Sequence, residues 1–325
     1  MLIAGTEDGA YRVTGVTERG DATVQEVLDA PRVERVRQFD VVDGVFAATE
    51  AGLYYSRDGR DWSDLRVPEE TVWAVTVAPT GERIYAGTVP AHVYVSPLPA
   101  DDFSPRDLDW RELEGFQRLP SRDDWGVPRH DNVARVRDLC VHPDSPNRIV
   151  AGVEPGGVHV TTDGGETWEE RNAGVHDDIH SIHVVDDGEY LAATGRGLYR
   201  TSNAGHSWTR LDENVQQRYF RTVYQYDGVL YASAARVPPS NYWETSDADP
   251  ALFKSRDGMS LERADFPCPD EVVVGWTTAD DTLVGATHRG TILRTGGETW
   301  EIVGHLPSSE TVPGCYYNLA WDPME

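Results

Sequence analysis

The stretch Thr161-Thr-Asp-Gly-Gly-Glu-Thr-Trp168 decides the fold, because altered copies of it recur along the chain. The other copies are Ser56-Arg-Asp-Gly-Arg-Asp-Trp62, Ser202-Asn-Ala-Gly-His-Ser-Trp208, Ser255-Arg-Asp-Gly-Met-Ser-Leu261 and Arg294-Thr-Gly-Gly-Glu-Thr-Trp300. Each reads as a tight turn, in which a carboxylate accepts hydrogen bonds from turn amides and glycine adopts a positive φ. The tryptophan then anchors the returning strand by burying a large apolar area. Recurrence of one such signature predicts a repeat architecture.

A second repeat, a β-rich segment that ends in small residues, gives the number of units. Its seven copies are Leu2-Ile-Ala-Gly-Thr6, Val45-Phe-Ala-Ala-Thr49, Ile84-Tyr-Ala-Gly-Thr88, Ile149-Val-Ala-Gly-Val153, Tyr190-Leu-Ala-Ala-Thr194, Leu230-Tyr-Ala-Ser-Ala234 and Leu283-Val-Gly-Ala-Thr287. A strand-like segment precedes every copy except the first, and the C-terminal segment 315–323 has the right pattern to supply the missing strand. We therefore predict an all-β fold, a single seven-bladed β-propeller domain over residues 1–325 with four-stranded antiparallel blades. The C-terminal strand is expected to close the ring by joining the N-terminal blade.

The turn copies resemble the Asp-box (BNR) repeat, Ser-x-Asp-x-Gly-x-Thr-Trp, which in that family joins the third and fourth strands of a propeller blade. The resemblance covers nearly the whole chain and extends to sialidase-like propellers and to seven-bladed propellers like the photosystem II assembly factors, which are noted for an arginine patch. It implies that the boxes lie on the face away from the ligand site. It also implies that ligand contacts come from the connections between blades and from the loops between second and third strands.

Composition indicates an environment and excludes some partners. The formal net charge is −26, and Lys254 is the only lysine among 29 basic residues. Such acidity favours a halophilic, haloarchaeal origin, since concentrated salt screens self-repulsion; a high-GC genome is the alternative reading of the missing lysine. The charge argues against binding to nucleic acid or anionic membranes. We expect a cytoplasmic protein without membrane insertion or cofactor, and its three cysteines fit a reducing compartment.

Aligning the innermost strands by the turns that follow them predicts a ring of side chains near the strand entrance. This column reads Arg37, Trp73, Arg137, His180, Arg221, Val274 and Tyr317, and the next reads Phe39, Val75, Leu139, Ile182, Val223, Trp276 and Leu319, which we assign to the core. Arg35 and Arg135 add positive charge nearer the opening. Clustered guanidinium groups bind planar oxyanions, so the ring is a candidate ligand site. The alternative is that each arginine pairs with a carboxylate of a neighbouring blade, such as Asp138 or Asp178.

Two long insertions map to the same predicted face and are expected to contact a ligand. Their candidate residues are Trp125, Arg129, His130 and Asp131 in 114–132, and Arg236, Tyr242, Trp243 and Glu244 in 235–250. A third insertion, 97–108, falls at a box position on the opposite face and is expected to be peripheral. Glu154 lies in a short loop on the predicted ligand face, either as an acid/base group or as the partner of an arginine.

The histidines offer an alternative metal site. His130, His176 and His180, together with Glu154, carry donor atoms suited to zinc or a similar ion. Strand alternation turns His183 away from the face of His180. The alternative interpretation is that these histidines are structural.

These residues lead to three candidate functions, of which a metal-dependent lyase or hydrolase is the third. The first, which we favour, is a non-catalytic recognition propeller that binds a protein segment or a small anionic ligand at the channel mouth. The second is a glycoside hydrolase of the sialidase type, because glycosidases share the boxes. That role requires Arg37, Arg137 and Arg221 for a substrate carboxylate, Tyr317 as nucleophile, Glu154 as its partner and Asp131 as acid/base. Sialidases, however, have six blades and an early Arg-Ile-Pro motif, and neither matches this chain.

Overall fold

The small-residue segments form the second strand of each blade, and their lack of bulk lets neighbouring blades touch. The computed structural model describes residues 1–17, 22–99, 103–126, 128, 131–239, 243, 245, 247–295, 299–307 and 318–322. A Cβ added to Gly87 would lie 2.5 Å from Cγ1 of Val136 in the next blade, and one added to Gly5 would lie 2.7 Å from Cγ1 of Val33. The small residues are therefore required wherever the innermost strand of the next blade packs against the second strand.

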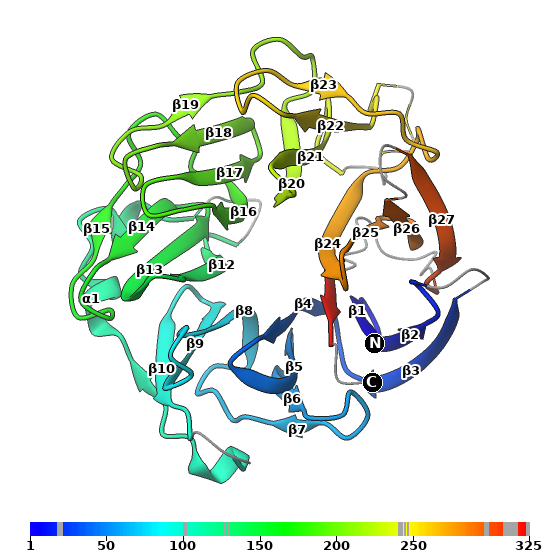
Figure 1. Ribbon diagram of the computed structural model, residues 1–325. Helices are drawn as coiled ribbons and strands as arrows, with labels where there is room; N and C mark the ends of the chain where they lie inside the picture. Colours follow the sequence, from blue (N-terminus) through cyan, green and yellow to red (C-terminus); the bar gives the residue numbers. More distant parts are fainter. Residues whose placement is uncertain are drawn as a thin grey trace.

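Seven four-stranded antiparallel sheets surround a central channel, which confirms the predicted seven-bladed propeller (Figure 1). Blade one consists of β28 (Asn318–Trp321), β1 (Leu2–Thr6), β2 (Gly9–Thr14) and β3 (Thr23–Asp29); blade two of β4 (Val33–Phe39), β5 (Val42–Thr49), β6 (Gly52–Ser56) and β7 (Ser63–Asp64); blade three of β8 (Thr71–Val77), β9 (Arg83–Val89), β10 (Val93–Pro97) and β11 (Arg111–Glu112); blade four of β12 (Arg135–His142), β13 (Ser145–Glu154), β14 (Gly157–Thr161) and β15 (Glu169–Glu170). Blade five consists of β16 (Ile179–Val184), β17 (Tyr190–Thr194), β18 (Gly197–Thr201) and β19 (Thr209–Arg210); blade six of β20 (Tyr219–Tyr226), β21 (Val229–Ala235), β22 (Ala251–Ser255) and β23 (Glu262–Arg263); blade seven of β24 (Val273–Ala279), β25 (Thr282–Thr287), β26 (Thr291–Thr295) and β27 (Trp300–His305). Short helical segments, η1 (Pro105–Asp107), α1 (Glu114–Gln117) and η2 (Arg122–Asp124), lie between blades or within insertions.

The chain closes the ring as the sequence predicts. β28 pairs antiparallel with β1, with Leu2 opposite Trp321 and Gly5 opposite Asn318. The Asp322 backbone N–H donates to the Met1 carbonyl at 2.8 Å, which extends this pairing. The closure leaves no open sheet edge between the first and last blades.

The recurrent turn stretches of the sequence form tight turns, as predicted. The Asp163 carboxylate accepts hydrogen bonds from the Thr161 hydroxyl at 2.7 Å and from the Thr167 N–H at 3.0 Å. Trp168 is 8% exposed and packs into the core, which is the anchoring role expected of it. In the box of blade seven, residues 296–298 lie outside the described part of the chain.

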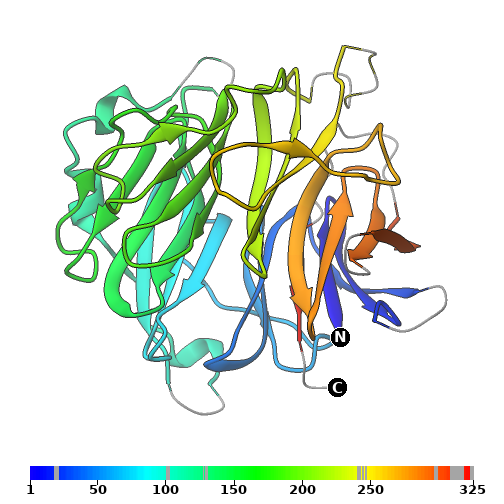
Figure 2. The same cartoon turned by 45° about the horizontal axis from the view of Figure 1, so that its top comes forward.

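The two ends of the channel carry different connections. At one end, which we call the turn face, each innermost strand turns back into the second strand. The N-terminus and the segment around η1 lie on this face, at the bottom of Figure 2. At the other end, the loop face, successive blades connect, and the chain after β21 lies there. The position of η1 confirms that the 97–108 insertion is opposite to the 235–250 insertion.

Candidate functional site

A β-bulge near the start of the innermost strand sets a ring of side chains around the channel. In blade three Val72 pairs with Thr88 and Ala74 with Gly87, so Trp73 is the extra residue between them. The same shift of register makes Arg137, His180, Arg221 and Val274 the extra residues of blades four to seven, and Glu34 that of blade two. A bulge re-aims the side chain of the inserted residue. Tyr317, the expected member from blade one, lies outside the described residues.

The prediction for blade two is therefore wrong by three residues, because Glu34 and not Arg37 occupies the ring. The sequence alignment treated Asp43-Gly44 as the hairpin turn, but Phe39 pairs with Val42, so the turn is formed by Asp40 and Val41. Gly44 instead lies within β5 at φ +87, where an added Cβ would be 2.3 Å from the Ser56 carbonyl oxygen. In the next column the core residue of blade two is accordingly Val36, which is fully buried, and not Phe39.

The ring is a buried bridge across the channel and not an open mouth. Its described members and their neighbours are buried, with exposures of 4% for Glu34, 5% for Trp73, 8% for Arg35, 4% for Arg137, 3% for His180 and 6% for Arg221. Arg35 Nη2 of blade two donates to the Arg137 carbonyl of blade four at 2.5 Å. The Asn318 side chain of blade one donates to the Glu34 carbonyl. The expected ligand site at the loop-face mouth is thus replaced by contacts that join blades one, two and four.

Carboxylates neutralise the arginines of this bridge, as the alternative interpretation proposed. Arg137 lies 3.5 Å from Glu34 Oε2 through Nη1 and 3.4 Å from Glu154 Oε2 through Nε. Asp138 Oδ1 lies 3.6 Å from Arg35 Nη2 and 3.4 Å from Arg37 Nη2. Burial alone would raise the pKa of Glu154, but the positive charge of Arg137 and its neighbours lowers it to about 2.

Aromatic stacking adds to the bridge. The guanidinium carbons of Arg135 and Arg137 lie 4.5 and 4.6 Å from the centre of the Trp73 ring. A cation over a tryptophan face in a desolvated site is stabilised by about 2 kcal/mol. Trp73 therefore holds the two arginines in place and is itself 5% exposed.

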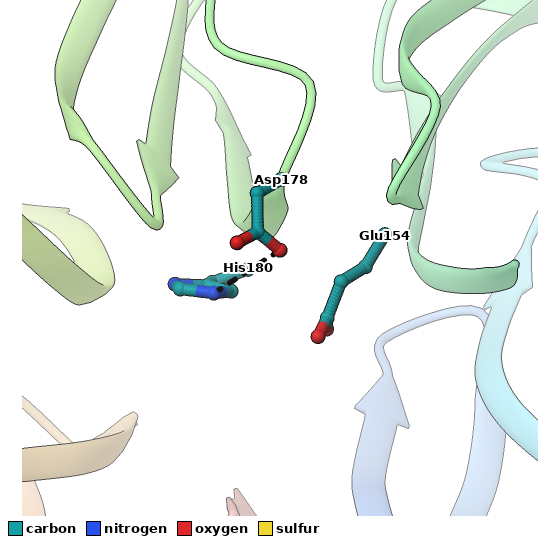
Figure 3. A group of neighbouring side chains, drawn as sticks. All are labelled: Glu154, Asp178 and His180. Carbon is teal, nitrogen blue, oxygen red and sulfur yellow. Dashed lines mark ion pairs between the residues drawn. The ribbon is translucent and has the colours of Figure 1, made fainter. Parts of the chain in front are cut away.

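Glu154, Asp178 and His180 form the described group that most resembles a metal site (Figure 3). Their donor atoms lie within 4.8 Å of one another, and His180 Nε2 is 3.8 Å from Asp178 Oδ1. His180 Nδ1 is 2.7 Å from the Phe220 carbonyl oxygen, and burial lowers the pKa of His180, so the neutral ring donates there. Arg137 already neutralises Glu154, and a divalent cation beside that guanidinium is disfavoured by charge repulsion.

The predicted histidine set is not assembled by the described residues. The ring nitrogen Nδ1 of His176 accepts a hydrogen bond from the Asp178 backbone N–H at 3.2 Å, and His130 lies outside the described residues. The three donors that do meet come from the second strand of blade four and the start of blade five. They fit an ion-pair network better than a zinc site.

The loop residues expected to contact a ligand have structural roles where they are described. Trp125 is 7% exposed and packs on His159 at a ring distance of 4.7 Å. Trp243 is 2% exposed, and its Nε1 donates to the Val237 carbonyl at 2.9 Å. Arg236 pairs with Asp249 at 2.9 Å. Asp131 adopts a positive φ of 54° in an exposed turn, and Arg129, Tyr242 and Glu244 lie outside the described residues.

A cavity of about 480 Å³ extends from the bridge to the turn face. We call the part beyond the bridge the turn chamber, whose lining includes Arg37, Phe39, Val41, Cys140, His183 and Tyr224. Val41 at its rim is 46% exposed, and the Arg37 side chain is 31% exposed, so this end of the channel is open. The sequence analysis assigned Arg37 to the other end of the channel and Phe39 to the core, and it named His183 only as turned away from His180. It did not single out Val41, Cys140 or Tyr224. The sequence signal for this lining was the residue that directly follows each core residue of the innermost strand, as in Cys140 after Leu139, His183 after Ile182 and Tyr224 after Val223.

The chamber wall combines the Arg37 cation and, at the rim, the Asp40 carboxylate with neutral polar and aromatic groups. Burial lowers the pKa of His183 to about 4, so the ring is neutral, and it packs on Tyr224 at a ring distance of 5.2 Å. The Tyr224 hydroxyl lies 3.1 Å from the Thr278 hydroxyl. Burial also raises the pKa of Cys140 to about 12, which keeps its sulfur as a thiol.

A second cavity of about 460 Å³ opens beside the chamber and shares Val41 with it. We call it the side cavity; its lining includes Tyr55, Arg57, Pro99 and Phe103. Phe103 packs on Tyr55 at a ring distance of 4.6 Å. The 97–108 insertion, expected to be peripheral, therefore builds part of the face on which the channel opens.

Comparison with known proteins identifies the fold and one recurrent relative. No protein-family model matches the chain. The photosystem II assembly lipoprotein Ycf48 of Trichormus variabilis is 26% identical over 152 residues, which cover 45% of this chain and 42% of that protein, so the match spans less than half of the relative. The solved structure of YCF48 bound to D1 peptide has a TM-score of 0.58 at 14% identity and covers 83% of this chain and 81% of that one. An ancestral GH74 enzyme has a TM-score of 0.60 at 15% identity, covering 86% of this chain and 39% of the enzyme.

These solved structures are too distant in sequence to show more than a shared propeller fold. None of the helices within the described residues has the length and apolar character of a membrane span.

Proposed function

We propose that the protein is a non-catalytic recognition propeller that binds a polypeptide segment of a partner in the turn chamber. The observation that carries the proposal is the cavity itself. Its volume of about 480 Å³ lies within the range of binding pockets, about 300–1,000 Å³, and its wall mixes apolar surface with a few polar groups. The resemblance to Ycf48, whose structure is described as bound to D1 peptide, supports a peptide as the ligand class.

The ionisation of the buried groups favours binding over catalysis. A general acid needs a pKa near the working pH, and Glu154 has a pKa of about 2 beside Arg137. Cys140 is held as a thiol by its raised pKa. The glycoside hydrolase alternative draws on the fold shared with GH74 enzymes and on residues such as Tyr317 outside the described part of the chain. Turnover of fluorogenic glycosides is its direct test.

The working environment that we infer is a salt-rich cytoplasm. The support is the formal net charge of −26 with a single lysine, together with Cys140 and Cys268, which are free thiols. Under these conditions weak surface attraction is screened, and recognition depends on groups enclosed in a cavity.

The proposal is tested by narrowing the chamber entrance. Val41→Trp adds bulk at the rim. Ile302→Trp introduces the same side chain at a residue of similar exposure, 49% against 46%, outside the lining of either cavity. Both proteins are applied to an array of random hexapeptides, and binding of each selected peptide is measured by fluorescence anisotropy. Loss of binding in the first variant alone supports the chamber. If both variants bind every selected peptide like the wild type, or if only free inorganic anions bind, the proposed function is wrong.

A further inference from the structure

We propose that the side cavity takes an aromatic side chain of the same partner segment that binds in the turn chamber, and that a lysine or arginine of the segment lies beside this side chain. This inference rests on the proposed function and adds a second anchor to it. Three features of the described residues carry it: the shared rim of the two cavities, the fixed apolar wall of the side cavity, and the carboxylates around both entrances.

The two cavities meet at the turn face. Val41, which is 46% exposed, lines both of them, whereas the next two residues, Val42 and Asp43, line the side cavity. A single side chain therefore stands between the two entrances. Two or three residues of extended chain, about 7–10 Å, are enough to pass over it, so one short segment can occupy both cavities.

A row of aromatic rings follows the same path beneath the surface. Phe39 lines the chamber, and Tyr55 and Phe103 line the side cavity. Phe46 lies between them, at ring distances of 5.8 Å from Phe39 and 5.0 Å from Tyr55, and Phe103 packs on Tyr55 at 4.6 Å. The floor between the two cavities is thus apolar and continuous.

The wall of the side cavity is fixed by contacts on both sides of the 97–108 insertion. The Leu98 N–H donates to the Glu82 carbonyl at 2.9 Å, and Trp110 Nε1 donates to the Leu65 carbonyl at 2.8 Å. Phe103 packs against the hydrophobic core of blades two and three. A preformed cavity of about 460 Å³ lies within the range of binding pockets and needs little ordering when a ligand enters.

The chemistry of this wall favours an aromatic occupant. Val41, Leu98, Pro99 and Phe103 present apolar surface. The Tyr55 hydroxyl already donates to the Asp43 carbonyl at 2.8 Å, so a buried polar group of a ligand would lose its hydrogen bonds to water without equivalent replacement. An aromatic ring buries a large apolar area and gains further from edge or stacked contacts with the rings of the wall.

The charges around the entrances select a basic neighbour for that ring. Asp40 lines the chamber, and Asp43 and Glu82 line the side cavity. Arg57 pairs with Asp43 at 3.4 Å, but within the described part of the chain no ion pair engages Asp40 or Glu82. These two carboxylates are available to a lysine or arginine of the segment, which gives the partner a charge complementary to this face.

The experiment uses two variants that each narrow one cavity. Thr80→Trp introduces a tryptophan at an exposed turn residue that lines the side cavity and not the chamber, and Pro143→Trp does so at an exposed turn residue that lines the chamber and not the side cavity. Met259→Trp is the control, at a residue that is 72% exposed and lines neither. Fluorescence anisotropy measures the affinity of each protein for the hexapeptides that the wild type selects from the random array.

We expect Thr80→Trp and Pro143→Trp each to lower the affinity for the same peptides by at least tenfold, and Met259→Trp to leave it unchanged. Replacing each peptide residue by alanine should reveal one Phe, Tyr or Trp whose loss also costs at least tenfold on the wild type. The same replacement should cost less than twofold on Thr80→Trp, because that variant no longer holds the ring.

The outcomes separate this inference from the proposed function. A loss of affinity in Pro143→Trp alone overturns the inference, whereas peptide binding in the chamber stands. A loss in Thr80→Trp alone, or in neither variant, overturns both, because the peptide then binds outside the chamber. If either variant does not fold, the alanine series on the wild type decides, and selected peptides without an aromatic anchor overturn the inference.

The basic neighbour is tested with Glu82→Gln. We expect this variant to bind peptides with a lysine or arginine beside the ring two- to threefold more weakly at about 0.15 M KCl, and equally well at about 2 M, because salt screens exposed ion pairs. Glu262→Gln, at an exposed residue of the outermost strand of blade six, removes the same charge and is the control. Equal affinities for Glu82→Gln and Glu262→Gln at the lower salt concentration would overturn the assignment of a basic neighbour.

Discussion

Removal of the Asp138 carboxylate is the sharpest test of the cross-channel bridge. Asp138 is 1% exposed, and its two oxygens serve three blades. Oδ1 lies 3.4 Å from Arg37 and 3.6 Å from Arg35 of blade two, and Oδ2 accepts the Ile182 backbone N–H of blade five at 3.0 Å. Asp138→Ala leaves buried positive charge without its counter-charge and a buried amide without an acceptor.

The expected loss of stability is about 4 kcal/mol, because breaking a buried ion pair from one side costs about 3–5 kcal/mol. With an unfolding entropy of about 2.1 cal/mol/K per residue over 325 residues, this loss lowers the melting temperature by roughly 6 °C. Asp138→Asn keeps an oxygen for the Ile182 N–H, and about half of the loss is expected.

Differential scanning calorimetry measures these shifts, with Asp43→Ala as the control. Asp43 also pairs with an arginine, Arg57 at 3.4 Å, but its side chain is 54% exposed. An exposed ion pair of this kind contributes less than about 0.5 kcal/mol to stability. The melting temperature of the control is therefore expected to lie within about 1 °C of the wild-type value. Equal melting of Asp138→Ala and Asp43→Ala would refute the reasoning that the bridge joins the blades.

Three further predictions concern stability and its dependence on solvent. Burial raises the pKa of Glu7 to about 7, and neighbouring carboxylates add to this effect while Arg32 opposes it. The ionised Glu7 side chain therefore destabilises the fold above pH 7, and this destabilisation disappears as the pH falls toward 4.5. The melting temperature of Glu7→Gln is therefore expected to exceed that of the wild type at pH 8 and to equal it near pH 4.5. Equal melting temperatures at both pH values would contradict this. Asp163→Ala removes the hydrogen bonds from Thr161 and Thr167 and is expected to cost about 1 kcal/mol at pH 7 by urea unfolding. Burial alone would raise the pKa of Asp163, but those hydrogen bonds lower it to about 2. The difference in unfolding free energy between wild type and variant should therefore shrink as the pH falls from about 4 toward 2. A difference that stays constant would mean that the carboxylate charge is irrelevant. The net charge of −26 predicts that the melting temperature rises when KCl is increased from 0.1 to 2 M, and a flat or falling curve would remove the argument for a salt-rich habitat.

The sequence was sufficient to predict the fold because the determinants of the blades are local or strictly repeated. Turn residues such as Asp163 bond within their own box, and small residues such as Gly87 are needed at every contact between blades. The C-terminal strand was recognisable because β1 lacked an inner neighbour in the repeat count, and it pairs as expected. Repetition thus compensates for the weakness of each single signal.

The site was harder to predict because one local signal has two structural meanings. The dipeptide Asp43-Gly44 has the composition of a hairpin turn, yet it lies inside β5, where Gly44 passes close to Ser56. The two readings differ by three residues and place different side chains in the ring. Only the pairing of β4 with β5 distinguishes them, and that pairing depends on tertiary contacts.

The direction in which the channel opens was also beyond the sequence. It depends on which arginines find carboxylates across the channel, and Arg35 and Asp138 belong to blades two and four, about one hundred positions apart in the chain. An acidic chain offers many candidate partners for each arginine. Geometry selects among them, and composition does not.

The division of the channel into a buried bridge and an open chamber separates stability from binding. In the bridge Asp138 is the ion-pair partner of both Arg35 and Arg37, so Asp138→Ala leaves buried positive charge without this partner and weakens the fold. At the rim Val41 is 46% exposed, and a larger side chain there obstructs entry without disturbing buried packing. The two substitutions should therefore affect different properties. Asp138→Ala is expected to lower the melting temperature, and Val41→Trp is expected to lower the affinity for peptide alone. A rim substitution that destabilised the protein as much as Asp138→Ala would mean that the chamber and the bridge form one structural unit, and the case for a preformed binding chamber would be lost.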